Sequence, residues 1–175
     1  MHDTSMVTMK KFVEQYQLTE RNVVVDIGSY DYNGSYRSLF LGSDGHYIGA
    51  DIVEGPGVDV IVGSSKWDDL KDVDAVISGQ TFEHVSDIPL LLGQIKKILK
   101  SGGLLCVIAP SAGPVHNCPI WVGYFSVEKM SEIITAAGFE IIDCTVNDVE
   151  PFRDTCCVAR KPEIKIERFV NESYI

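Results

Sequence analysis

The stretch Val23-Val24-Val25-Asp26-Ile27-Gly28-Ser29-Tyr30-Asp31-Tyr32-Asn33-Gly34 decides the fold. An apolar run ends in an acidic residue and breaks at Gly28, and a loop with a second glycine follows. This order is typical of a strand, a tight turn and the start of a helix. In an open α/β sheet, ligands bind beyond the carboxyl ends of the strands, where backbone N–H groups are available. The stretch therefore predicts a nucleotide-like ligand at this loop.

Apolar strand patterns alternate with helical patterns along the rest of the chain. Strands are predicted over residues 23–27, 46–51, 58–62, 74–78, 104–109, 139–145 and 155–160. Helices are predicted over residues 5–16, 35–41, 87–100 and 127–137, with Ser126 as an N-cap of the last and Gly102-Gly103 as the C-cap after 87–100. The alternation implies a doubly wound, mostly parallel sheet with right-handed crossovers, whose strand ends meet at one edge.

Composition narrows the class of protein. The chain has 175 residues, of which 45% are hydrophobic, and this suits one globular domain without a membrane span. A formal net charge of -10 disfavours nucleic acid as a partner, because that affinity depends on cationic side chains. Five cysteines show no zinc-binding spacing, so no metal is predicted and a reducing, cytoplasmic setting is expected. Those in strand-like runs are expected to pack as small apolar groups: Cys106, Cys144, Cys156 and Cys157.

The residues around the loop indicate the charge of the ligand. Asp51 ends the second strand about 20 residues after the glycine loop, the separation expected of a carboxylate that binds a ribose. A dinucleotide fingerprint needs a glycine where this chain has Tyr30, so a bulky ring occupies the place of a diphosphate. Asp26, Asp31 and Asp51 also favour a cationic ligand. A sulfonium nucleoside meets both conditions.

Five segments resemble the class I S-adenosylmethionine-dependent methyltransferases, specifically the methyltransferase type 11 group. The segments are Val25-Asp26-Ile27-Gly28-Ser29 with Asn33-Gly34, Tyr47-Ile48-Gly49-Ala50-Asp51, residues 78–85 with Glu83-His84-Val85, Leu99-Lys100-Ser101-Gly102-Gly103-Leu104, and Ala136-Ala137-Gly138-Phe139-Glu140. The resemblance implies a Rossmann-like, three-layer α/β/α fold with seven strands, the last of them antiparallel. It implies a methyltransferase domain over residues 1–161, followed by a C-terminal tail over 162–175.

The resemblance also assigns the cofactor site residue by residue. It implies that the loop from Gly28 through Ser29 and Tyr30 to Gly34 lies along the methionine part and ribose of S-adenosylmethionine, and that Asp51 accepts from both ribose hydroxyls. Ile52 would flank the adenine. Ser64 and Ser65 stand where this family often has an acid that bonds the adenine amino group, and a serine can accept one such bond. The backbone of Gln80 would contact the methionine end.

Several residues allow more than one interpretation. Asp26 either contacts the cofactor loop or holds the turn by accepting N–H bonds. The Glu83-His84 pair is interpreted as a structural fixture of its loop, with a catalytic dyad as the alternative. His116 lies on the loop after the fifth strand, where a general base could act on the acceptor or the side chain could simply be exposed. Three aromatic residues could form a wall for a planar or sugar substrate or cover the sheet edge: Trp121, Tyr124 and Phe125.

The sequence thus predicts an enzyme that transfers a methyl group to an O or N nucleophile of a small-molecule or saccharide acceptor. The chain contains no inserted substrate domain, which favours a small acceptor or a site completed by a second subunit. Two alternatives are a binding protein of the same fold without transfer activity and a nucleotide-dependent oxidoreductase or sugar-modifying enzyme.

Overall fold

The sheet extends on both sides from β1 (Val24–Ile27), whose four residues are all buried. In the computed structural model, which describes residues 3–18, 21–40, 47–63, 66–115 and 120–163, seven strands pair in the order β3-β2-β1-β4-β5-β7-β6. β7 runs antiparallel to both of its neighbours, and the other pairs are parallel. The other strands are β2 (Tyr47–Asp51), β3 (Val60–Ile61), β4 (Val73–Gly79), β5 (Leu99–Pro110), β6 (Glu140–Val146) and β7 (Asp154–Arg160). The predicted Rossmann-like fold with an antiparallel last strand is confirmed.

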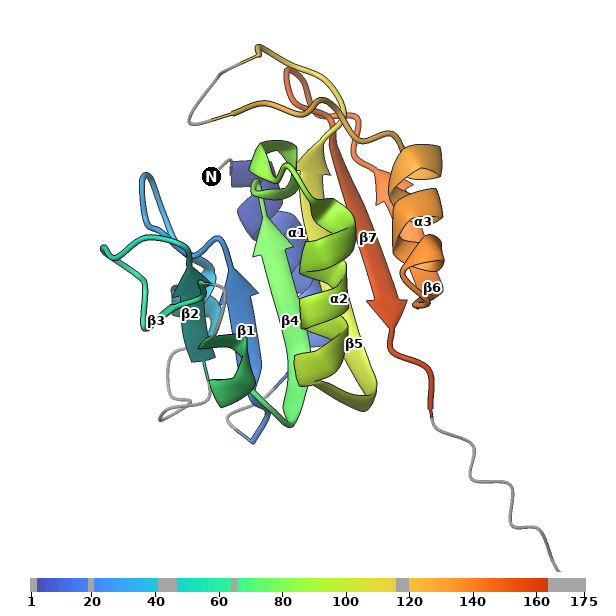
Figure 1. The fold of residues 1–175 in the computed structure, drawn as a ribbon. Coiled ribbons are helices and arrows are strands. Elements are labelled where there is room, and N and C mark those ends of the chain that lie inside the picture. Colours follow the sequence, from blue (N-terminus) through green and yellow to red (C-terminus); the bar gives the residue numbers. More distant parts are fainter. Residues whose placement is uncertain (1–2, 19–20, 41–46, 64–65, 116–119, 164–175) are drawn as a thin grey trace, which may run out of the picture.

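Helices cover both faces of this sheet, as Figure 1 shows. α1 (Asp3–Gln15) and the 3₁₀ turn η1 (Tyr36–Phe40) pack on one face, and α2 (Ile88–Ile98) and α3 (Val127–Ala136) on the other. Two further 3₁₀ turns are η2 (Lys66–Asp69) and η3 (Phe82–His84). The Ser126 hydroxyl caps α3 by accepting from Lys129 N, as predicted.

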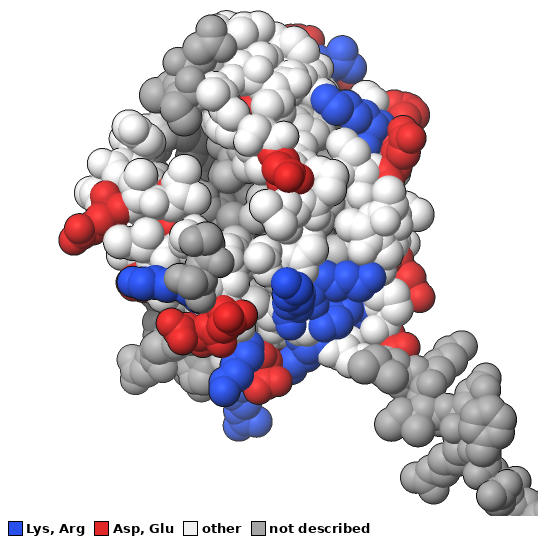
Figure 2. All heavy atoms as spheres, viewed as in Figure 1, with Lys and Arg blue, Asp and Glu red and all other residues white. Residues whose placement is uncertain are grey.

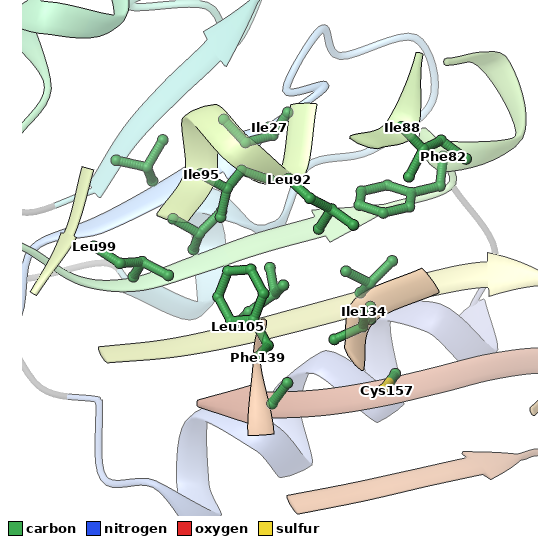
Figure 3. Packing of buried hydrophobic residues seen from close by; sticks show 14 of the residues in the cluster. Ile27, Phe82, Ile88, Leu92, Ile95, Leu99, Leu105, Ile134, Phe139 and Cys157 are labelled. Atoms are coloured by element: carbon green, nitrogen blue, oxygen red, sulfur yellow. The ribbon is translucent and has the colours of Figure 1, made fainter. Parts of the chain in front are cut away.

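Side chains along the central strands alternate between two apolar cores. On β5, Leu105 and Val107 belong to the core under α2 and α3, and Cys106 and Ile108 to the core under α1. This alternation follows from the two-residue period of a strand, and it explains why strands covered on both faces are apolar throughout. Figure 3 shows the first core, in which Leu92 and Ile95 of α2 lie over the sheet.

The predicted glycine C-cap of α2 is wrong. α2 ends at Ile98, and Leu99 already has an extended backbone and begins β5 by pairing with Val73. Pairing of this segment with β4 takes the place of one more helical turn. An ion pair of 2.7 Å between Lys100 and Asp74 supports the pairing. Gly102, at φ +77, lies where the register between β4 and β5 shifts.

The third strand is shorter than predicted. β3 contains only Val60 and Ile61, although Asp59 N and Val62 N still donate to Gly49 O and Asp51 O of β2 at 2.8 and 2.7 Å. The Asp59 side chain also accepts from Gly49 N at 2.7 Å and from Arg37. The segment predicted as a helix over residues 35–41 is the 3₁₀ turn η1 within its described part.

Charged side chains are unevenly distributed on the face shown in Figure 2. Blue atoms gather low in that view with red atoms beside them, a second group of blue and red atoms lies at the upper right, and the surface between these groups is mostly white. Among the described helices, none combines the length and apolarity needed to cross a membrane.

Replacing Leu92 by alanine should lower the free energy of unfolding by about 2–5 kcal/mol, because the side chain is fully buried and its removal leaves a cavity. Leu90→Ala on the same helix is the matched control, since Leu90 is 61% exposed, and it should change stability by less than about 0.5 kcal/mol. Urea titration of both variants measures the difference, and equal losses would contradict the described packing of α2.

Candidate functional site

The segments that follow β1 and β4 are in contact at Gly28 and Thr81. This glycine has φ +81, and a Cβ built on it would lie only 2.1 Å from Thr81 Oγ1. Any other residue would therefore push the two exits apart and strain the backbone. The close approach places the glycine loop beside the residues that follow β4.

Asp51 and the end of β2 hold the backbone of the glycine loop. The N–H groups of Gly28 and Ser29 donate to Ala50 O at 2.9 and 3.3 Å, and Tyr30 N donates to Asp51 Oδ2 at 3.1 Å. Asp51 Oδ1 accepts from Ile52 N at 2.7 Å. The carboxylate of Asp51 is half-buried, so it remains open to solvent at the sheet edge.

Asp26 is a buried residue of β1, just before the glycine loop. Its carboxyl is 4% exposed and accepts a hydrogen bond from the Tyr47 hydroxyl. Burial raises the pKa of Asp26 to about 7, although the bond from Tyr47 and the nearby Arg37 act in the opposite direction. Among the described residues, the N–H groups of the turn donate to Ala50 O and Asp51 Oδ2, and the role of Asp26 toward the cofactor stays a prediction.

The ring of Tyr30 lies against the loop between β2 and β3. A Cβ on Gly55 would meet Tyr30 Cε2 at 2.2 Å, so the ring occupies the space beside that glycine. The exposed ring of Tyr32 lies 4.7 Å from it, centroid to centroid. Gly34 N, at the end of the loop, donates to Asp31 Oδ1 at 2.7 Å.

Gln80 has a left-handed backbone, with φ +56, directly after β4. Its N–H donates to Ile108 O at 2.8 Å, and its side-chain amide donates to Asp154 Oδ1 at 2.9 Å. Asp154 is 1% exposed and also accepts from the Thr4 hydroxyl of α1 at 3.0 Å. The sequence carries no local signal for the bond between Thr4 and Asp154, because these residues lie 150 positions apart.

The Glu83-His84 pair anchors the chain that follows β5. Val122 N donates to Glu83 O at 2.8 Å, and His84 Nδ1 bonds Ile120 O. The Glu83 side chain is 1% exposed, and neither of its oxygens has a hydrogen-bond partner among the described residues. Burial raises the pKa of Glu83 to about 7. These contacts are those expected of the structural interpretation.

Two of the three candidate wall residues lie together. The rings of Trp121 and Tyr124 meet edge to face at 5.2 Å, and the His84 ring lies 6.0 Å from Trp121. Phe125, in contrast, is fully buried and packs against Phe82 in the core. The aromatic surface available to a ligand therefore comes from Trp121 and Tyr124.

Three predicted site residues, Ser64, Ser65 and His116, lie outside the described residues. The cysteines predicted to pack as apolar groups do lie in strands as free thiols, with Cys106 and Cys157 buried. Within the described ranges, no three His, Cys, Asp or Glu side chains gather as a metal site would require.

Comparisons with known proteins agree with this geometry. Residues 40–107 match the family model described as a methyltransferase domain. A Burkholderia thailandensis 1,6-didemethyltoxoflavin-N1-methyltransferase, solved with S-adenosylhomocysteine, has a TM-score of 0.69 at 19% identity, over 91% of this chain and 79% of that one. A methyltransferase of Aquifex aeolicus described as SAM dependent has a TM-score of 0.66 at 20% identity, over 87% and 88%.

The same fold also supports other chemistry. The [4+2]-cyclase SpnF has a TM-score of 0.62 at 16% identity, over 89% of this chain and 81% of that one. No curated protein matches the sequence. The domain match over residues 40–107 and the shared fold confirm the predicted resemblance to class I methyltransferases of the type 11 group.

Glu83 should make the fold less stable as the pH rises. The pKa of the Glu83 carboxyl rises on folding from 4.5 to about 7. Below pH 4.5 the carboxyl is protonated in both the folded and the unfolded state, so it costs no stability. As the pH rises from 4.5 to about 7 the unfolded state ionises first, the free energy of unfolding falls, and the full loss is present above about pH 7. Glu83→Gln should therefore gain stability over the wild type at pH 8, on the order of 3 kcal/mol, and little at pH 4.

The measurement is urea unfolding of both proteins from pH 4 to pH 8. Because Asp26 has a pKa raised in the same direction, only the difference between variant and wild type reports on Glu83. Glu140→Gln, at an exposed position of β6, is the control and should follow the wild type at every pH. A Glu83→Gln difference that does not change with pH would contradict the raised pKa of this buried carboxyl.

Proposed function

Because the chain carries a methyltransferase domain on a seven-stranded class I fold, we propose that it transfers the methyl group of S-adenosylmethionine to an O or N nucleophile of a small-molecule or saccharide acceptor. The observation that carries the proposal is the meeting of three strand exits at one edge, with Gly28 pressed against Thr81 and the Asp51 carboxylate beside them. Ligands of open α/β sheets bind in such a crevice.

The described residues fit this cofactor. The glycine loop presents backbone without a side chain at Gly28, and the buried Ser29 Oγ has no hydrogen-bond partner among the described residues. An ionised carboxylate offers about four acceptor positions. The N–H groups that Asp51 already accepts come from Tyr30, Ile52 and, at a long 3.3 Å, Val53. A ribose hydroxyl can use the remaining position and a second can displace the longest bond.

Each residue of the loop then has a role toward the cofactor. Residues Gly28, Ser29, Tyr30 and Gly34 line the methionine and ribose, and the exposed Ile52 side chain covers the adenine. The backbone of Gln80 meets the methionine end. Asp26 acts beneath them through Tyr47. Ser64 and Ser65 stay predictions for the adenine amino group.

The acceptor side is argued from the aromatic pair Trp121 and Tyr124. Both rings are half-buried at the exit of β5, and a planar heterocycle or a sugar face packs well against such rings. The toxoflavin methyltransferase, a neighbour in fold, was solved with the planar compound 1,6-didemethyltoxoflavin, which supports a small planar acceptor.

Orientation supplies most of the rate in this proposal. When bound, S-adenosylmethionine supplies an electrophilic methyl group, and the chain's part is to align the nucleophile and exclude water. Alignment of reacting atoms can contribute roughly 7–11 kcal/mol. A base is needed only where the nucleophile must lose a proton, and His116 is the candidate for that step.

Thermal-shift ranking separates this proposal from its alternatives. S-adenosylmethionine and S-adenosylhomocysteine should raise the melting temperature by mass action, and NAD and UDP-sugars should not. Stabilisation by NAD alone would favour the oxidoreductase. Tight cofactor binding, with no methylated product formed from any member of a panel of planar heterocycles, phenols, amines and sugars, would favour a binding protein.

Asp51→Ala should weaken S-adenosylhomocysteine binding ten-fold or more, because a hydrogen bond to a charged group contributes about 1.5–3 kcal/mol. Isothermal calorimetry measures this loss. Asp68→Ala, at an exposed position of η2, is the control. Unchanged affinity in Asp51→Ala would mean that the ribose lies elsewhere.

His116→Ala tests the base. If His116 takes the acceptor's proton, turnover at saturating cofactor should fall by about 10²–10⁴-fold near neutral pH, and cofactor affinity should stay constant. Undiminished turnover with any methylated acceptor would remove His116 from the reaction.

A further inference from the structure

Buried contacts from several elements converge on Gly79 and Gln80, at the exit of β4. The Gln80 amide donates to Asp154 Oδ1, at the start of β7, over 2.9 Å. The hydroxyl of Tyr36 in η1 fills the place of a Gly79 side chain, since a Cβ there would lie 2.0 Å from it. Gln80 N is held by Ile108 O of β5. The backbone at this exit is therefore fixed by tertiary contacts.

The first turn of α1 contacts Asp154 and Tyr36, the two residues that pack on Gln80 and Gly79, through two hydroxyl groups. Thr4 Oγ1 donates to Asp154 Oδ2 at 3.0 Å, so one buried carboxyl joins α1 to Gln80. The Ser5 hydroxyl, fully buried, forms a short hydrogen bond with the Tyr36 hydroxyl. Figure 1 shows the start of α1 near the upper end of β4, in agreement with these bonds.

The backbone of Gln80 needs such support. A glutamine at φ +56 lies in the left-handed region, which side-chain-bearing residues adopt mainly when their surroundings impose it. Among the described residues, the hydrogen bond from its side-chain amide to Asp154 Oδ1 is the side-chain contact that holds Gln80 in this conformation. Without it, the left-handed backbone of Gln80 would lose one of the contacts that hold it, and the bond from Gln80 N to Ile108 O would remain.

We propose that Asp154 is a positioning residue for cofactor binding. Its carboxyl fixes the Gln80 backbone through the hydrogen bond from the Gln80 side-chain amide, and it links Gln80 to the first turn of α1 through the bond from Thr4. The proposal rests on the proposed function, because it takes the Gln80 backbone as the surface that meets the methionine end of S-adenosylmethionine. Asp154 itself is 1% exposed, so in this proposal it acts through Gln80 and not by contact with the ligand. Coupling of this kind is reciprocal, so cofactor binding also stabilises the first turn of α1.

Calorimetry with S-adenosylhomocysteine tests the positioning role. Asp154→Ala should weaken binding about ten-fold, since one net hydrogen bond is lost from the support of Gln80. Asp154→Asn should stay within about three-fold of the wild type, because its amide oxygen still accepts from Gln80 and its NH₂ group can donate to the Thr4 hydroxyl. Leu92→Ala is the control for lost stability, since it weakens the distant core and should bind normally at a temperature where it is folded.

A double-mutant cycle and hydrogen exchange make the result decisive. Gln80→Met removes only the amide and should cost about as much affinity as Asp154→Ala, and the double variant should cost no more than either alone. In the wild type, ligand binding should slow amide exchange in the first turns of α1, and in Gln80→Met this protection should be lost. If Asp154→Ala does not fold, Gln80→Met and Thr4→Val give the same comparison, with both expected to bind more weakly.

Each outcome has one meaning. Failure of the wild type to bind S-adenosylhomocysteine would overturn the proposed function itself. Normal binding by the wild type together with normal binding by folded Asp154→Ala or Gln80→Met would overturn the positioning role alone. Additive losses in the double variant, or α1 protection that persists in Gln80→Met, would overturn the coupling between α1 and the site.

Discussion

The contact between Gly28 and Thr81 is the constraint on which the site depends. The Cα of Gly28 lies so close to the Thr81 side chain that a Cβ would overlap it at 2.1 Å. This proximity follows from the parallel pairing of β1 with β4, in which Asp26 stands opposite Ile77. The glycine turn and the residues after β4 consequently form one continuous backbone surface, and the Asp51 carboxylate closes it from the β2 side.

The carboxyl groups of this region fall into two kinds. Asp51 is half-buried, accepts backbone N–H groups and remains open at the sheet edge. Asp26 and Glu83 are buried, and burial raises the pKa of both to about 7. A buried carboxyl with such a pKa is a poor partner for a cation at the surface. The contact of Asp26 with Tyr47 favours support of the loop over direct contact with a ligand.

Local patterns predicted where the strands lie along the chain, because each pattern depends on residues close in sequence. The β-branched run before Gly28 and the apolar stripe of α2 are such patterns. The cofactor half of the site stays a prediction. Local patterns failed where a tertiary contact determines the backbone conformation. Leu99 was predicted in the helix, but it pairs with Val73 as the first residue of β5. The Thr4–Asp154 bond joins residues 150 positions apart, and no periodicity could have predicted it.

The two halves of the site differ in how strongly the fold determines them. The cofactor half is made from the ends of β1, β2 and β4, whose positions follow from the sheet. The acceptor half comes from one segment after β5, joined to η3 by the bonds from Val122 to Glu83 and between His84 and Ile120. Side chains such as Trp121 can change there without disturbing a strand, because the anchoring bonds use backbone atoms of the segment. In the proposed function, the acceptor is therefore selected by side chains that the sheet does not constrain, and the same fold can support different reactions.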